Sequence, residues 1–156
     1  MAVFSAPCSL RASEQMLDKW QHRIYRTKFL MKLKRKVRRL ADKYPGLVDV
    51  GRLDDIQTMT AFTKQIATPL CRFADVADYY ASGDCVNSIK RVSRPLLMVN
   101  ALNDPFLTGE CYPVEVANDC ALFHLEMPRS GGHAAFPVSR TETWVAARVE
   151  RFISEL

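Results

Sequence analysis

The run Pro95–Leu102 (PLLMVNAL) is apolar at nearly every position and rich in β-forming residues at its middle. A strand of this composition is covered on both faces, as in parallel sheets flanked by helices. The run ends at Asn103 and Asp104, so a carboxylate follows the carboxyl end of the strand, where open α/β sheets build active sites. A second apolar run, Ala121–Met127, leads through a glycine loop to His133, and a helix-patterned segment follows. The pattern predicts an α/β fold with an acid and a histidine at one rim of a sheet.

This order of strand, acid, strand, glycine loop, histidine and helix is the one in which an α/β-hydrolase presents the last two members of a Ser-Asp-His triad. In that role Asp104 would accept a hydrogen bond from the Nδ1–H of His133, which fixes the tautomer and stabilises the imidazolium. His133 would deprotonate a serine and then protonate the leaving group. Asp104 has an alternative role in an Asx turn ahead of Pro105, and His133 has one as an ordinary loop histidine. Position in the chain does not separate the two interpretations of Asp104.

Three blocks of residues carry a more specific resemblance: Thr68–Tyr80 (TPLCRFADVADYY), Asp104–Phe106 (DPF) and Gly131–Phe136 (GGHAAF). In this order and spacing they resemble the YheT-like branch of the α/β-hydrolases, which are carboxylesterases, and the resemblance covers residues 1–156. It implies the C-terminal part of that fold, with about three parallel strands, flanking helices, and residues 14–80 as a helical cap insertion. It also favours Asp104 as the triad acid and His133 as the base.

The nucleophile of such a triad has no counterpart in the sequence. The strained turn that carries it requires the motif G-x-S-x-G, and no two of the six glycines, at 46, 51, 83, 109, 131 and 132, are four residues apart. Ser5 and Cys8 lie on or after the first strand, and Ser130 belongs to the loop of the histidine. We therefore expect the C-terminal portion of a serine carboxylic-ester hydrolase, truncated ahead of its nucleophile and oxyanion hole and inactive alone.

The alternative is a non-catalytic or split protein. The apolar segment Met1–Pro7 (MAVFSAP) has the composition of a strand, and it would form an unpaired edge of the sheet. Such an edge can pair with another chain, which would supply the missing half.

The net charge of +5 does not by itself indicate a nucleic-acid or membrane partner. Much of the excess lies in Lys28–Arg39, which we expect to form a helix with a solvated cationic face. Its predicted apolar face consists of Phe29, Leu33, Val37 and Leu40. The alternative for this helix is a surface that binds phosphate groups or anionic lipid. Five cysteines without metal-ligand spacing indicate free thiols. With no signal peptide and no membrane-spanning run, we expect a cytoplasmic protein that acts on a small-molecule ester without a metal or cofactor.

The remaining candidate residues favour structural roles. We expect His22 to lie at the surface, His124 to be a buried or edge histidine, and Asp119 to lie in a turn before a strand. Two further predictions concern helices. The pair Asp54 and Asp55 opens a helix whose apolar face is Ile56, Met59, Phe62 and Ile66. Trp20 and Tyr25 pack under a cap, with the lining of an acyl pocket as the alternative. Asn103 is set aside as an acid, because an amide cannot stabilise an imidazolium as a carboxylate does. A capping box at Ser139–Glu142 would start a final helix whose apolar stripe is Trp144, Val145, Val149, Phe152, Ile153 and Leu156.

Overall fold

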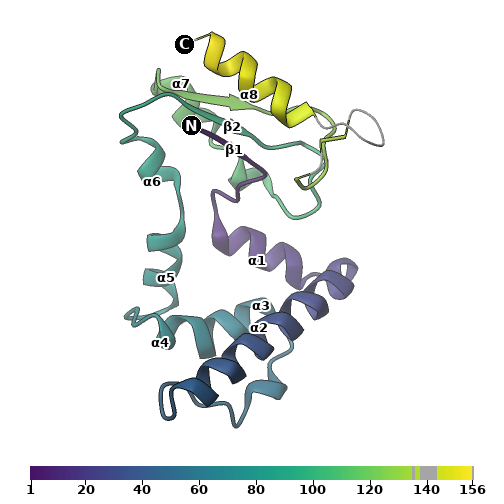
Figure 1. Ribbon diagram of the computed structural model, residues 1–156, viewed down its shortest axis with the longest axis vertical. Helices are drawn as coiled ribbons and strands as arrows, with labels where there is room; N and C mark the ends of the chain where they lie inside the picture. The colour runs from purple at the N-terminus through teal and green to yellow at the C-terminus, as the bar shows by residue number, and fades with distance from the viewer. Residues whose placement is uncertain (135, 138–143, 156) are drawn as a thin grey trace. The chain divides into compact units, whose positions relative to one another are not determined.

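The computed structural model describes residues 1–134, 136–137 and 144–155. The chain divides into two compact units. Unit 1 combines Met1–Ser9 with Asp84–Leu156, and unit 2 is the continuous segment Leu10–Gly83 (Figure 1). Unit 2 is thus inserted into the sequence of unit 1. None of the helices in the described part of the chain has both the length and the apolarity that crossing a bilayer requires.

Unit 1 is built on a parallel sheet. Its described strands are β1 (Ala2–Phe4), β2 (Leu96–Val99) and β3 (Phe123–Glu126), in the spatial order β1-β2-β3. Both pairings are parallel, with Val3 opposite Met98 and Met98 opposite Leu125. The three parallel strands that the resemblance implies are confirmed, and the strand ahead of Asp104 is the central one of those described.

The central strand β2 is apolar throughout because it is buried on both faces. Strand side chains alternate between the two faces of a sheet, and the residues of β2 divide between two core clusters accordingly. One cluster contains Cys8, Ile89, Leu96, Met98, Val116 and Phe123, with residues of α6 (Val86–Ile89) and α7 (Val114–Asp119). The other contains Leu97, Val99, Ala101, Phe136 and Phe152, the last from α8 (Trp144–Ser154). Helices therefore cover both faces of the sheet, as an α/β fold requires.

The final helix α8 packs on the sheet through Phe152, which is buried, while Trp144 and Val145 are partly buried against the same cluster. Ile153 is 65% exposed, so its predicted place in the apolar stripe is wrong. Consecutive helical residues are rotated by about 100° from each other, and Phe152 already occupies the sheet-facing direction. The predicted capping box at Ser139–Glu142 and the stripe position Leu156 lie outside the described residues.

Unit 2 is helical throughout its regular structure. Its elements are α1 (Leu10–Asp18), the 3₁₀ turn η1 (Trp20–His22), α2 (Arg23–Lys43), the 3₁₀ turn η2 (Leu53–Asp55), α3 (Met59–Phe62), the π-helical η3 (Thr63–Ala67), α4 (Thr68–Leu70) and α5 (Val76–Gly83). Its core consists of Leu30, Val37, Leu53, Ile56, Phe62 and Ile66. Unit 2 therefore has a hydrophobic cluster of its own.

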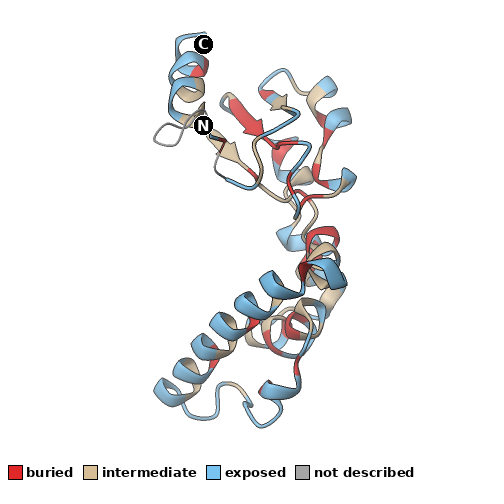
Figure 2. Cartoon of the chain, turned by 90° about the vertical axis from the view of Figure 1, so that its right-hand side faces the viewer, coloured by how far each residue is buried: buried red, intermediate tan, exposed pale blue. Residues whose placement is uncertain are grey.

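Several predictions for the start of unit 2 are wrong. His22 is buried, with 7% of its surface exposed, whereas Trp20 is 82% and Tyr25 51% exposed. The 3₁₀ turn η1 lies between α1 and α2, so the helical repeat is interrupted there and its register is shifted. On α2 the buried residues are Leu30 and Val37, so Val37 is buried as predicted, whereas Phe29 is 42% exposed. Figure 2 shows α2 exposed along most of its length, with buried positions on one side only.

The helix expected to open at Asp54 begins later. Asp54 and Asp55 lie in the short turn η2, and Asp54 pairs with Arg38. The helix α3 starts after Thr58, whose hydroxyl accepts a hydrogen bond from the N–H of Ala61 at 3.1 Å. Threonine is one of the residues preferred at the N-cap of a helix. Ile56, Phe62 and Ile66 are nevertheless buried, as predicted.

Candidate active site

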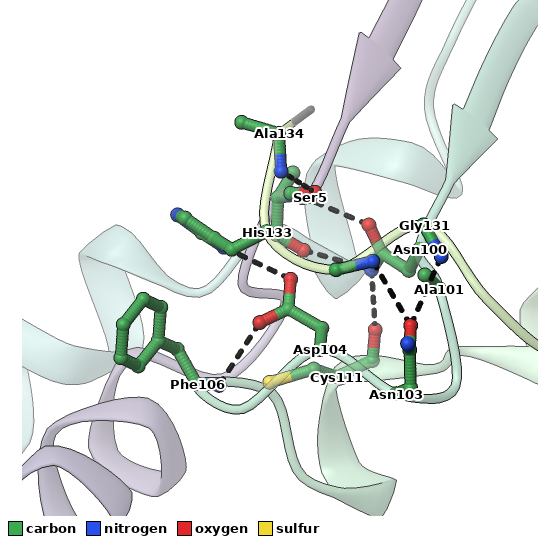
Figure 3. Close-up of polar contacts among 12 residues, drawn as sticks. Ser5, Asn100, Ala101, Asn103, Asp104, Phe106, Cys111, Gly131, His133 and Ala134 are labelled. Carbon is green, nitrogen blue, oxygen red and sulfur yellow. Dashed lines mark hydrogen bonds and ion pairs between the residues drawn. The ribbon is translucent and has the colours of Figure 1, made fainter. Parts of the chain in front are cut away.

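The acid and the histidine singled out in the sequence meet in unit 1. Nδ1 of His133 lies 2.9 Å from Oδ2 of Asp104. The Asp104 side chain is fully buried, whereas the His133 side chain is 41% exposed. Figure 3 shows the other ring nitrogen of His133 directed away from the carboxylate. The pair therefore presents an imidazole whose inner nitrogen is engaged and whose outer nitrogen is accessible.

Asp104 is held by the turn that follows β2. Its backbone N–H donates to the carbonyl of Ala101 at 3.1 Å. Its Oδ1 accepts the backbone N–H of Phe106 at 2.9 Å, which is an Asx turn. The other carboxylate oxygen faces His133. The two roles weighed for Asp104 are therefore compatible, since each uses a different oxygen.

The loop of His133 depends on its two glycines. A Cβ on Gly131 would lie 2.5 Å from ring atoms of Phe136 and 3.0 Å from Cβ of Ala101, so no larger residue fits without a shift. Gly132 has φ of +61°, a left-handed conformation that glycine adopts without strain. The backbone N–H of Phe136 donates to the carbonyl of Gly131 at 3.0 Å and closes the loop. The tight turn expected before His133 is present.

Two residues that sequence reasoning did not assign to the site contact this loop. Oδ1 of Asn103 accepts the backbone N–H groups of Gly131 at 3.0 Å and Gly132 at 2.9 Å. Oγ of Ser5 accepts the N–H of Ala134 at 3.0 Å (Figure 3). Asn103 was judged only as an acid and Ser5 only as a nucleophile. The position of Asn103 directly before Asp104, in the same turn, was the feature of the sequence that could have indicated its place in the site.

A third polar residue joins the ends of two strands. Asn100 is fully buried. Its amide nitrogen donates to the carbonyls of Ala6 and Cys111, each at 2.9 Å, and its oxygen accepts the N–H of Ala6 at 3.0 Å. Buried amide groups are costly unless they are hydrogen-bonded. Asn100 therefore ties the chain after β1 to the chain after β2, directly beneath the site.

A cavity of about 690 Å³ opens beside His133. Its lining combines the polar loop residues with an apolar wall, and consists of Asn103, Pro128, Ser130, Gly131, Gly132, His133, Phe136, Pro137 and Trp144. Cavities of this size accommodate small organic molecules. The arrangement therefore offers a general base at the rim of a partly apolar cavity.

The serines and cysteines weighed as nucleophiles are not activated by His133 in any contact that the structure records. The hydroxyl of Ser5 is occupied with the N–H of Ala134, and Ser130 lines the cavity from the loop of His133 itself. Cys8 is fully buried, and its pKa is raised by its hydrogen bond with Cys85 and by burial. The pKa of Cys85 is lowered to about 7 by the same bond, but Cys85 packs against the cluster on the opposite face of the sheet from Phe136.

The other histidines and acids weighed in the sequence lie elsewhere. Asp119 is the last residue of α7. His124 is exposed on β3, and its ring lies edge-on to that of Phe152, with 5.2 Å between the two ring centroids. His22 belongs to unit 2. Within the described ranges, no group of three or more His, Cys, Asp or Glu residues is arranged to hold a metal ion.

Comparisons with known proteins place this geometry in context. No protein-family model matches the chain, and no solved structure gives a significant match. An Escherichia coli K12 protein named "Putative esterase YheT" is 24% identical over 97% of this chain and 46% of its own length. Bovine "Phospholipase ABHD3" is 25% identical over 57% of this chain and 22% of its own. A Dictyostelium discoideum "Abhydrolase domain-containing protein" is 27% identical over 64% of this chain and 26% of its own.

The chain therefore spans less than half the length of each of these three curated relatives. The part that it does span contains three parallel strands with helices on both faces. These matches and the sheet agree with each other: the chain is related to the α/β-hydrolase superfamily and corresponds to the C-terminal part of the E. coli protein.

Proposed function

We propose that this chain carries the acid and the base of a serine-type hydrolase of carboxylic esters. The observation that supports the proposal is the 2.9 Å contact between a fully buried carboxylate and a half-exposed imidazole at the mouth of a cavity. A buried carboxylate on Nδ1 selects the tautomer whose Nε2 can accept a proton. The names of the relatives, an esterase and a phospholipase, fit an ester as the substrate class.

The chemistry assigned to the pair is acyl transfer in two steps. In the first, Nε2 of His133 takes the proton of a serine hydroxyl while the serine oxygen bonds to the ester carbonyl carbon. The imidazolium, stabilised by Asp104, then gives that proton to the alkoxide as the bond to the leaving group breaks. In the second step a water molecule repeats the sequence, and the acyl group leaves as a carboxylic acid.

The proposal assigns the serine and the oxyanion hole to a polypeptide segment outside these 156 residues, because the sequence holds no G-x-S-x-G motif. Loss of a triad nucleophile costs roughly 10⁶-fold in rate. Loss of oxyanion donors costs about 10²–10³-fold each. The chain alone is therefore proposed to be inactive as an esterase.

Two further assignments accompany this proposal. Unit 2 is proposed to be the cap insertion of the fold, since it is an all-helical segment inserted in sequence between β1 and α6. The cytoplasm is proposed as the location because all five cysteines are free thiols.

The test of the proposed function begins with the DNA that precedes the codon of Met1, read in the same frame for a G-x-S-x-G motif. The polypeptide that includes the motif is then assayed for ester hydrolysis beside its Asp104→Asn and His133→Ala variants. We expect Asp104→Asn to lower kcat by about 10⁴-fold, because the imidazole is left in the wrong tautomer. We expect His133→Ala to lower it by roughly 10⁶-fold.

Asp119→Asn and His124→Ala are the matched controls, because they make the same chemical changes away from the cavity. Both are expected to leave the rate within about threefold of the unmodified protein. Activity that survives both Asp104→Asn and His133→Ala overturns the assignment. A reading frame without any such motif favours the second candidate.

The second candidate is a chain that pairs with another polypeptide through the edge of β1. The N–H of Leu97 donates to the carbonyl of Met1, and the N–H of Ser5 donates to the carbonyl of Val99, both at 2.9 Å. In a parallel pair, residues 1, 3 and 5 therefore face β2. The backbone groups of Ala2 and Phe4 point to the opposite side, and β1 has a single strand neighbour among the described residues. Such an edge is a template for another strand.

A further inference from the structure

We propose that Asn103 and Ser5 are positioning residues that hold the imidazole of His133 against Asp104 by fixing the peptide N–H groups on both sides of it. This inference rests on the proposed function of His133 as the base. It assigns a role in the site to an amide and a hydroxyl that touch neither the imidazole nor the carboxylate in any contact the structure records.

Asn103 holds the loop ahead of His133. Its single amide oxygen accepts two consecutive backbone N–H groups, those of Gly131 and Gly132. The N–H of Leu102 also donates to the carbonyl of Pro128 at 2.8 Å, which fastens the beginning of the loop to the same turn. Because Asp104 follows Asn103 directly, one short turn fixes both the carboxylate and the loop that brings the imidazole to it.

Ser5 holds the loop after His133. Its side chain lies just beyond β1, is buried, and accepts the N–H of Ala134 at 3.0 Å. Ser5 has φ of +51°, and Ala134 has φ of +73°. Left-handed conformations cost an L-residue about 1–2 kcal/mol and persist where surrounding contacts enforce them. The N–H of Ser5 donates to Val99, so the central strand holds Ser5 in this conformation.

The loop needs such contacts because its own sequence is permissive. Gly131 and Gly132 leave the backbone ahead of His133 with many accessible conformations. The Asp104 carboxylate is fixed independently by its Asx turn and by burial. Removal of an Asn103 or Ser5 contact should therefore displace the imidazole and leave the acid in place. A displacement of about 1 Å is enough to reduce a reaction rate by roughly 10²-fold.

The experiment measures the tautomer of His133 in the 156-residue chain labelled with ¹⁵N at its histidines, at about pH 9, above the range in which imidazole side chains ordinarily titrate. A carboxylate on Nδ1 favours the Nδ1–H tautomer, whereas a free imidazole side chain prefers Nε2–H. We expect the ratio of Nδ1–H to Nε2–H to fall about fivefold or more in Asn103→Leu and in Ser5→Ala. Asn103→Asp, which keeps the accepting oxygen, should retain the ratio of the unmodified chain.

Ser130→Ala is the matched control, since it removes a hydroxyl from the same loop without touching either contact. Hydrogen exchange of the backbone N–H groups of Leu97 and Val99 shows that the sheet remains folded in each variant. If Asn103→Leu and Ser5→Ala speed the exchange of the Gly131, Gly132 or Ala134 amides while the tautomer ratio stays unchanged, the positioning role is overturned. The proposed function fails on a different result, namely ester hydrolysis that persists in His133→Ala. The tautomer measurement does not depend on that result.

Discussion

Each carboxylate oxygen of Asp104 has a partner of its own. Oδ1 accepts the N–H of Phe106, and Oδ2 faces Nδ1 of His133. The first contact does not involve His133, so it orients the carboxylate independently of the imidazole. A fully buried carboxylate left without such partners would be strongly destabilising. The Asx turn is thus part of what allows an acid to lie beneath His133.

For Glu14 in unit 2, the effect of burial on the pKa outweighs the effect of its hydrogen bonds. Its carboxylate accepts hydrogen bonds from the hydroxyls of Thr63 at 2.7 Å and Tyr80 at 2.8 Å. Burial nevertheless raises the pKa of Glu14 above its ordinary value of 4.5, in spite of these two bonds. The pKa of Tyr80 is also raised, mainly by burial and then by its hydrogen bond to Glu14, so the Tyr80 hydroxyl remains protonated and donates.

The raised pKa of Glu14 predicts a pH dependence of stability. The folded chain binds the Glu14 proton more tightly than the unfolded chain does. The contribution of this group to the free energy of unfolding is therefore complete below pH 4.5 and is lost as the pH rises through the raised pKa. We expect Glu14→Gln to flatten this decline, measured by hydrogen exchange of residues 63–67 at intervals between pH 4.5 and neutrality. Glu150→Gln, at an exposed glutamate of α8, is the control, and equal slopes for both variants would contradict the prediction.

Among single residues, the sequence indicated that one acid and one histidine would lie together, and the structure places them 2.9 Å apart, while their catalytic roles stay predictions. Asp104 and His133 carry side chains suited to acid–base chemistry, and each follows a recognisable strand or glycine pair. Asn103 and Ser5 were not assigned to the site because their contacts are made with backbone N–H groups, which every residue possesses. The burial of His22 was also missed, because a single 3₁₀ turn determines which way its side chain points.

Among the elements, the strands were easier to predict than the helices. β2 is apolar at every position because two helical layers cover it, and that requirement is visible in four consecutive residues. In unit 2 the helices are interrupted at Trp20–His22 and change to a π-helix at Thr63–Ala67. Such interruptions leave little trace in periodicity. The predicted apolar face of α2 is nevertheless buried at Val37 and partly buried at Leu33, and it fails only at Phe29, where Leu30 is buried instead.

The edge of β1 leads to a prediction about this element. Ala2→Pro removes the N–H that points away from β2, and leaves the bonds that residues 1, 3 and 5 make with β2. If the edge pairs with another strand, the chain self-associates at high concentration, and Ala2→Pro should weaken that association by about tenfold. Sedimentation equilibrium measures the effect.

Ala2→Val is the matched control for this change, because it adds similar bulk and keeps the N–H. Association that is equally strong in Ala2→Pro and in the unmodified chain would show that the β1 edge is not the contact. Loss of association in both variants would indicate that bulk at residue 2, and not the N–H, is responsible.

For the whole molecule, the proposed function predicts a specific lack of reactivity. The 156-residue chain should not be labelled stoichiometrically by a fluorophosphonate, and it should hydrolyse a p-nitrophenyl ester no faster than its His133→Ala variant does. The reason is that an acid and a base without a nucleophile and oxyanion donors lack most of the rate enhancement. Mass spectrometry of the labelled chain measures the first expectation. Stoichiometric labelling would locate a nucleophile, with Ser5 and Ser130 the first sites to inspect.

Local sequence was sufficient for the apolar strands, for the burial of the central strand β2, and for the acid and histidine that follow strands β2 and β3. Each of these depends on a few consecutive residues, because a buried strand must be apolar and a turn after it needs particular side chains. Contacts between distant segments could not be read in this way. Asn103 and Gly131 are 28 residues apart, and Ser5 and Ala134 are 129 apart. These hydrogen bonds arise because strand register and turn geometry bring the two segments together. The residues next to each partner in the sequence do not indicate which distant group it will contact.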